Sequence, residues 1–225
     1  MKKTAHFSPE LFQFLEELRE NNNREWFQAN KDRYESAVRQ PCLRFIADVA
    51  AHLHTISLYF VADPSPTGGS LFRIYRDVRF SKDKSPYKTQ VGMSFWHIEG
   101  GKMVHVPGFY LHLEPGGCFA AAGVWHPDAA TLKKIRAAIV QRPDAWRAVR
   151  RSGLKIEGGK LARPPKGYDA DHPLIEDLKW KDYVTSISFS EAKVCRPGFI
   201  TDFTAACRRM SPLVEFLTEA LGLSW

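Results

Sequence analysis

Residues Phe109–Trp125 read FYLHLEPGGCFAAAGVW, and this stretch decides the fold. Its first six residues alternate between two faces, which predicts a strand with one apolar face. Pro115-Gly116-Gly117 predicts a turn, after which Cys118–Trp125 returns as a second strand of mostly small residues. The stretch therefore predicts a hairpin and, around it, an antiparallel sheet.

Two more segments share this two-residue period. In Gln90–Trp96, the residues Val91, Met93 and Phe95 form the apolar face, and Tyr183–Ser190 alternates in the same way. Each of these segments predicts a further strand with one half-exposed face.

Helical spacing dominates the N-terminal quarter of the chain. Ser8-Pro9 opens a first amphipathic helix, because proline suits the first helical position. A second helix follows Asn21-Asn22-Asn23 and must kink or end at Pro41, and a third helix covers Cys42–Thr55.

The C-terminal segment Gly198–Leu221 is also helical, with an expected break near Ser211-Pro212. The layout predicts an α+β fold, a mostly antiparallel sheet covered by N-terminal and C-terminal helices in a single compact domain over residues 1–225. The helical N-terminal part covers about 8–55, the mixed sheet and helix core about 70–190, and the C-terminal helices about 198–221.

The composition is that of an ordinary globular protein, with 44% hydrophobic and 25% charged residues. Four scattered cysteines favour free thiols in a reducing cytoplasm over a disulfide framework or a zinc ribbon. The start Met1–Ala5 is basic like a secretory leader, but the apolar stretch that must follow is missing. No segment is long and apolar enough for a membrane span, so we expect a cytoplasmic protein without a membrane partner.

The net charge of +7 favours acidic partners, and more than half of it comes from the segment Phe72–Thr89. There, six Lys and Arg residues stand against Asp77 and Asp83, with aromatic residues between them. Arginine binds phosphate or carboxylate through paired hydrogen bonds, and aromatic rings stack on bases and sugars. The candidate ligand-binding residues of this segment are Arg73, Arg76, Arg79, Lys84, Tyr87 and Lys88. The alternative is structural: the aspartates pair with neighbouring arginines and the aromatic residues anchor the core.

Tyr110, His112 and Glu114 project from the polar face of their predicted strand. A histidine beside a carboxylate and a phenol can transfer protons near neutral pH or complete an anion site. Tyr110 and His112 are therefore candidate ligand-binding residues, and the alternative is a polar sheet face turned to solvent or covered by a helix. Trp125, at the end of the next strand, is expected in the core, with the border of a cleft as its alternative.

Other kinds of site have less support. The histidines and acids show no recognised metal-ligand spacing, and no glycine-rich fingerprint of a nucleotide cofactor is present. No G-x-S-x-G motif and no activated cysteine are visible, so the sequence names no catalytic residue. We therefore expect neither a metal nor a cofactor.

Several longer stretches resemble one family. They are Asn23-Arg24-Glu25-Trp26-Phe27, Arg73-Ile74-Tyr75-Arg76-Asp77, Arg79-Phe80-Ser81-Lys82-Asp83-Lys84-Ser85-Pro86-Tyr87-Lys88-Thr89, Pro107–Leu113, Ala121–Trp125, Arg163-Pro164-Pro165 and His172–Leu178. On these stretches the chain resembles the domain of unknown function 2461 family, from about Phe7 to Leu221. The resemblance implies a single compact domain in a mostly bacterial family without an established reaction, so it names no catalytic residue.

These observations predict a protein that binds a phosphorylated or other anionic small molecule through its Arg and Lys cluster, with or without a reaction on it. The alternative is a nucleic-acid binding module, in which the same segment follows a phosphate backbone while Tyr75 or Tyr87 stacks on a base. A third alternative is an interaction protein without a ligand, which predicts a patch of exposed apolar residues.

Overall fold

The computed structural model describes residues 5–101 and 105–225. Residues 1–4, which begin the leader-like segment, lie outside this part of the chain, as do residues 102–104. The elements in chain order are α1 (Pro9–Glu20), α2 (Arg24–Ala29), α3 (Lys31–Tyr34), the π-helix η1 (Glu35–Arg39), α4 (Gln40–His54), β1 (Phe60–Val61), β2 (Val91–His97), β3 (Gly108–Leu113), β4 (Cys118–Val124), α5 (Ala129–Gln141), α6 (Pro143–Arg151), α7 (Ile175–Leu178), β5 (Tyr183–Phe189), α8 (Glu191–Val194) and α9 (Phe199–Ala220).

One antiparallel sheet has the strand order β1-β2-β3-β4-β5. Strands β2, β3 and β5 are the three that the two-residue period predicts, and β4 is the predicted return strand of the hairpin. The hairpin turns at Gly116, whose φ of 77° suits glycine. The short strand β1, which the sequence did not predict, pairs Phe60 with His97 at the end of β2. With helices at both ends of the chain, the α+β single-domain prediction is confirmed.

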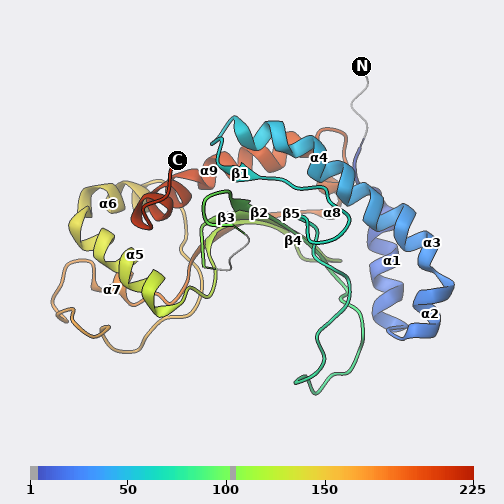
Figure 1. Cartoon of the computed structure of the whole chain (residues 1–225), viewed down its shortest axis with the longest axis horizontal. Coiled ribbons are helices and arrows are strands. Elements are labelled where there is room, and N and C mark those ends of the chain that lie inside the picture. Colours follow the sequence, from blue (N-terminus) through green and yellow to red (C-terminus); the bar gives the residue numbers. More distant parts are fainter. Residues whose placement is uncertain (1–4, 102–104) are drawn as a thin grey trace.

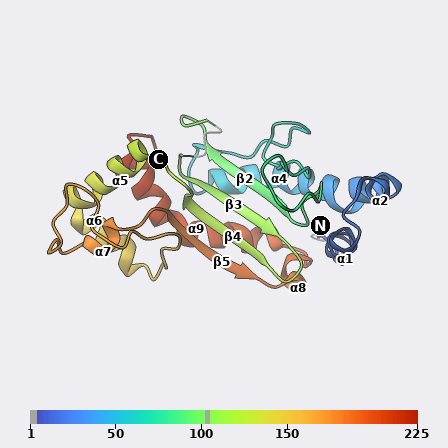
Figure 2. The same ribbon diagram turned by 90° about the horizontal axis from the view of Figure 1, so that it is seen from below.

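The two faces of the sheet differ. Helices α4 and α9 cover one face (Figure 1), and α9 packs against β4 and β5. Phe109, Leu111 and Leu113 of β3 are fully buried on that side, while Tyr110 and His112 alternate with them and point to the other side. Figure 2 shows β2 to β5 from this second side, where no helix of the described residues covers the strands.

Both helical ends depart from the predicted breaks. A π-helical turn, η1, precedes Pro41, and the chain remains helical through this proline from α3 to α4. The break expected near Ser211-Pro212 is wrong, because α9 continues through Pro212. Pro212 has no N–H for the carbonyl oxygen of Arg208, and Ser211 Oγ donates to that oxygen at 2.9 Å instead.

The uncovered face of the sheet lies under an arch (Figure 1). Helices α5 to α7 form one side of the arch, and a long loop between β1 and β2 extends along the other side. This loop contains the basic segment Phe72–Thr89, which we call the basic arm. Among the described residues, none of the helices has the length and apolar character needed to cross a membrane.

Candidate functional site

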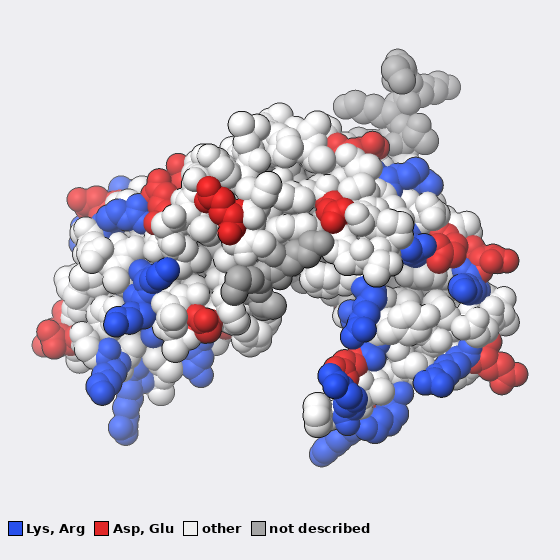
Figure 3. Space-filling model, viewed as in Figure 1, with Lys and Arg blue, Asp and Glu red and all other residues white. Residues whose placement is uncertain are grey.

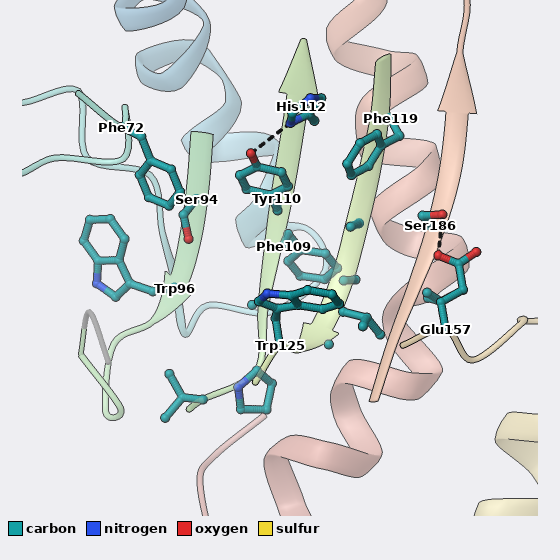
Figure 4. A pocket seen from close by; sticks show the side chains of 18 of the residues that line it. Phe72, Ser94, Trp96, Phe109, Tyr110, His112, Phe119, Trp125, Glu157 and Ser186 are labelled. Atoms are coloured by element: carbon teal, nitrogen blue, oxygen red, sulfur yellow. Dashed lines mark hydrogen bonds between the residues drawn. The ribbon is translucent and has the colours of Figure 1, made fainter. Parts of the chain in front are cut away.

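A cavity of about 860 Å³ opens on the uncovered face of the sheet. Cavities of this size accommodate small organic molecules. Its aromatic lining comes from four different segments, and its polar lining is sparse (Figure 4). The aromatic residues are Phe72, Trp96, Phe109, Tyr110, Phe119 and Trp125, and the principal polar residues are Ser94, His112, Glu157, Ser186 and Ser188.

The alternation of large and small residues produces this hollow. Tyr110 and His112 of β3 stand on the cavity face, but the neighbouring strands place Gly92, Ala121 and Gly123 there. A Cβ atom at Gly92 would lie 2.5 Å from Tyr110 Oη, so glycine at this position leaves the space that the phenol occupies. The uncovered face of the sheet therefore carries aromatic rings, and the small residues beside them leave the space of the cavity.

A chain of polar contacts runs along the edge of the cavity. Tyr110 Oη lies 3.1 Å from His112 Nδ1, and His112 Nε2 lies 3.2 Å from Glu114 Oε2. Arg19 of α1 donates to the other oxygen of Glu114 at 3.3 Å. The Phe119 ring stacks on the His112 imidazole with 4.6 Å between ring centroids, which fixes the orientation of the imidazole.

One tautomer satisfies both contacts of His112: Nδ1 accepts from the Tyr110 hydroxyl, and Nε2–H donates to Glu114. Burial, with a smaller contribution from the negative charge of Glu114, raises the pKa of Tyr110 to about 12. The phenol is therefore neutral at physiological pH, and its oxygen lone pairs remain free to accept a hydrogen bond from a ligand. A proton arriving at this oxygen has a path to the imidazole.

The basic arm is fixed to the N-terminal helices at Tyr87. This side chain is buried and stacks on Phe27 of α2 with 4.1 Å between ring centroids. The Asn22 amide donates to the carbonyl oxygen of Tyr87 and accepts from its N–H, each at 3.0 Å. Tyr87 thus anchors the arm, and its ring has no free face for a base, whereas Tyr75 beside it is half exposed.

Three predicted cations of the arm have partners within the arm. Arg76 pairs with Asp83, and Arg79 pairs with Asp77 at 2.7 Å. Hydrogen bonds from Ser85 and from Arg76 hold the pKa of Asp83 well below its usual range. Lys84 Nζ donates to the carbonyl oxygen of Val78 at 3.0 Å. The pairing of Arg76 and Arg79 with aspartates matches the structural alternative, and the contact of Lys84 also lies within the arm.

The remaining two predicted cations lie together beside the cavity. Lys88 Nζ donates to the carbonyl oxygen of Arg73 at 2.9 Å and lies 5.7 Å from the centroid of the Phe72 ring. The Phe72 ring lines the cavity 6.0 Å from the Tyr110 ring, so it connects this pair to the predicted residues on β3. Desolvation and the positive charge of Arg73 lower the pKa of Lys88. Within the described parts of the chain, neither cation forms an ion pair with a carboxylate, although the positive charge of Arg73 helps to lower the pKa of Asp77, which pairs with Arg79.

A second group of cations lies at the opposite edge of the sheet. A smaller hollow of about 300 Å³ shares Glu157, Thr185 and Ser186 with the cavity and is also lined by Lys155 and Arg209. Glu157 accepts a hydrogen bond from Ser186 Oγ at 2.9 Å. No acidic side chain in residues 5–101 or 105–225 forms an ion pair with Lys155 or Arg209.

The profile of a family described as "Conserved hypothetical protein (DUF2461)" matches residues 10–216. The chain belongs to the DUF2461 family. The match includes the basic arm, the cavity strands and both groups of cations, and it confirms the resemblance of the sequence motifs. A search of curated proteins found no match.

In this DUF2461 chain, several cavity residues escaped the sequence prediction. Trp125 is 53% exposed and lines the cavity, so its expected place in the core is wrong and the alternative, the border of a cleft, holds. Trp96, Phe119, Ser186 and Glu157 were not singled out either. The two-residue period that selected Tyr110 and His112 would also have placed Phe119 on the polar face of β4, but Glu157 comes from a loop without a period.

The charged surface of this family member follows the arch. Figure 3 shows Lys and Arg side chains at the lower ends of both sides, over α5 to α7 and over the basic arm. No cluster of three or more His, Cys, Asp or Glu side chains that would suit a metal ion is found among the residues the structure describes.

Proposed function

We propose that this protein binds a phosphorylated small molecule with a planar ring, of the nucleotide class. The ring lies on the aromatic lining of the cavity, and the phosphate binds Arg73 and Lys88. The observation that carries the proposal is that Lys88 lies beside the Phe72 ring of the cavity lining and close to Arg73, and that neither cation forms an ion pair with a carboxylate among the described residues.

The electrostatics of Lys88 support a phosphate at this position. Its ammonium group is partly buried next to a guanidinium, and both effects lower its pKa. Such a group is stabilised by an anion that contacts both cations, because the anion offsets the like-charge repulsion and replaces lost hydration. Arginine adds a planar fork that matches phosphate geometry.

The lining of the cavity supports a planar ring rather than a bare phosphate. Aromatic faces stack on bases, and each such stack stabilises a complex by about 1–3 kcal/mol. Tyr110 Oη and Ser94 offer hydrogen-bonding groups to the polar edge of the ring. The contact of Tyr110 with His112 also provides a proton path, which a reaction on the bound ligand would use. The four free cysteines support the cytoplasmic location that we propose for this binding.

The test is a thermal-shift titration with the four nucleoside 5′-monophosphates, followed by calorimetry on those that shift the protein. At a concentration of 100 times Kd, a ligand adds about 2.7 kcal/mol, which corresponds to a rise in Tm of about 5–10 °C. Arg73→Ala and Lys88→Ala should each weaken binding about tenfold or more. Lys84→Ala is the matched control, because Lys84 is an exposed cation of the same arm that contacts only a backbone carbonyl.

Two results would contradict the proposal. One is the absence of a shift with every monophosphate, and with inorganic phosphate and ribose phosphate as additional probes. The other is equal weakening by Lys84→Ala and Lys88→Ala, because that result would indicate attraction by the net charge of the arm rather than a built site.

A further inference from the structure

In the described parts of the chain, cations without an ion-pair partner lie at two opposite edges of the sheet, and one nucleotide can occupy only one of these edges. We propose that the biological ligand is a single-stranded nucleic acid, which crosses the uncovered sheet face from Arg73 and Lys88 to Lys155 and Arg209. This inference rests on the proposed function, because it uses the same aromatic lining and the same first phosphate site.

The separation of the two edges supports a polymer. Arg73 and Lys88 lie beside Phe72, whose N–H donates to Gly92 of β2, whereas Lys155 and Arg209 lie beside Thr185 and Ser186 of β5. Three strand spacings separate β2 from β5, which amounts to about 14 Å. A nucleoside monophosphate carries one phosphate, so only a polymer places phosphates at both ends of this span.

The floor between the edges suits unpaired bases. Phe72, Tyr110 and Phe119 follow one another across β2, β3 and β4, and Trp125 extends the floor at the end of β4 (Figure 4). Small residues at Ala121, Gly123 and Ser186 leave space between the rings and β5. Stacking on such a floor requires bases that are not stacked within a duplex, so the surface fits a single strand.

Among the described residues that line the cavity, Glu157 is the one with an acidic side chain. Its carboxylate is held by Ser186 and would repel a phosphate at that point. A carboxylate accepts hydrogen bonds from the exocyclic amino groups of bases. We therefore propose that a second phosphate of the nucleic acid binds Lys155 and Arg209, and that the amino group of a base binds Glu157.

The distribution of charge over the chain agrees with two phosphate sites. The arm, residues 72–89, holds six Lys and Arg against two acids, and residues 129–181 hold thirteen against six. The net positive charge of these two segments together exceeds the net charge of the whole chain, which is +7, so the remaining residues carry a net negative charge. They form the two sides of the arch on which Lys and Arg gather in Figure 3. A phosphate chain that passes under the arch meets cations on both sides.

The experiment measures fluorescence anisotropy of labelled thymidine and uridine oligomers of about four, eight and twelve nucleotides, beside calorimetry of the monophosphates. The test variant is the double charge reversal Lys155→Glu with Arg209→Glu. The matched control is Arg44→Glu with Arg208→Glu, which makes the same change in net charge. Arg44 is an exposed residue of α4, and Arg208 of α9 donates to Thr55. Neither is among the residues that line the cavity or the smaller hollow, whereas Arg209 of the same helix α9 lines the smaller hollow.

We expect affinity to rise at least tenfold from the monophosphate to the oligomer of about eight nucleotides. Contacts to about four phosphates give a log–log salt slope near −2.8, and the test variant should reduce it to about −1.4. The test variant should also weaken oligomer binding about tenfold or more and leave the monophosphate Kd unchanged. The thymidine and uridine series show which sugar the site prefers.

Three outcomes overturn the inference while the proposed function stands: an oligomer that binds no tighter than a monophosphate, equal losses in the test and control variants, or tighter binding of a duplex than of its separate strands. If neither oligomers nor monophosphates bind, both this inference and the proposed function fail.

Discussion

Replacing Gly92 with alanine should disturb the cavity without removing any of its side chains. The added Cβ would lie 2.5 Å from Tyr110 Oη, 3.1 Å from Tyr110 Cε2 and 3.0 Å from the Phe72 ring. Ordinary contacts at Cβ are about 3.4 Å or longer, so the phenol must move by about 1 Å. Its 3.1 Å contact with His112 Nδ1 then exceeds hydrogen-bonding distance.

The magnitude follows from three contributions. The lost hydrogen bond costs about 1 kcal/mol, and the overpacking costs about 1–3 kcal/mol. Alanine loses less conformational entropy than glycine when the strand folds, which offsets about 0.5–1 kcal/mol of this loss. The net loss is about 1–3 kcal/mol in the free energy of unfolding, which lowers Tm by about 4–8 °C at the middle of this range.

The assay is urea unfolding followed by circular dichroism, with monophosphate titration of the folded variant. Ser94→Ala is the control, because Ser94 points to the same cavity face of β2 and alanine there adds no atoms. Gly92→Ala should lose stability and ligand affinity, and Ser94→Ala should lose less than about 1 kcal/mol. A Gly92→Ala protein with unchanged stability and unchanged ligand affinity would refute the packing of Phe72 and Tyr110 around this glycine.

Three further changes test other parts of the structure. The pKa of Tyr110 is about 12 in the folded protein and about 10 in the unfolded chain, so the free energy of unfolding should fall as pH rises from about 10 to about 12. Tyr110→Phe removes this ionisation, so its free energy of unfolding should fall less over the same range, by up to about 2–3 kcal/mol. Urea unfolding at several pH values measures the difference. A constant difference between the two proteins over this pH range would disprove it. Gly123→Ala should leave little folded protein by circular dichroism, because φ at Gly123 is 123° and an added Cβ would overlap the Tyr183 carbonyl of β5. Gly117→Ala is the control and should fold, because a Cβ there has its nearest neighbouring atom at 3.7 Å. Asp182→Ala should lower the free energy of unfolding, measured in urea, by about 2–4 kcal/mol. The buried Asp182 carboxylate accepts hydrogen bonds from the N–H groups of His126 and Gly159, at 2.8 and 2.9 Å. A loss below about 0.5 kcal/mol would show that these N–H groups find other acceptors.

Sequence patterns were sufficient for most of the secondary structure. Three of the five strands follow from the two-residue period, β4 follows from the turn that precedes it, and helices α1, α4 and α9 follow from helical spacing. The short strand β1 has only two residues, too few for a period to be recognised. Pro212 misled the prediction because its effect on α9 depends on whether another donor reaches the Arg208 carbonyl, and Ser211 supplies that donor.

The candidate site was predictable only where its residues share a strand. Alternation along β3 assigns Tyr110 and His112 to the face opposite the core, whatever packs around them. For the basic arm, the sequence supplied the cations and aspartates, but the same residues fitted both an anion site and internal ion pairs. Periodicity fixes which face a side chain takes, and it carries no information about partners in an irregular loop.

The tertiary structure decided which of these residues act together. Asn22 fixes Tyr87 across 65 residues of sequence, and Arg19 reaches Glu114 across 95 residues. The Asn22 contact holds the arm against the N-terminal helices, with Lys88 beside Phe72, while Arg76 and Arg79 pair with aspartates of the arm itself. The sequence alone determined four of the five strands, the helical character of both ends of the chain and the supply of charge. The arrangement of Lys155, Trp125 and Lys88 around one cavity depends on how distant segments pack, and local patterns of polarity do not encode such distances.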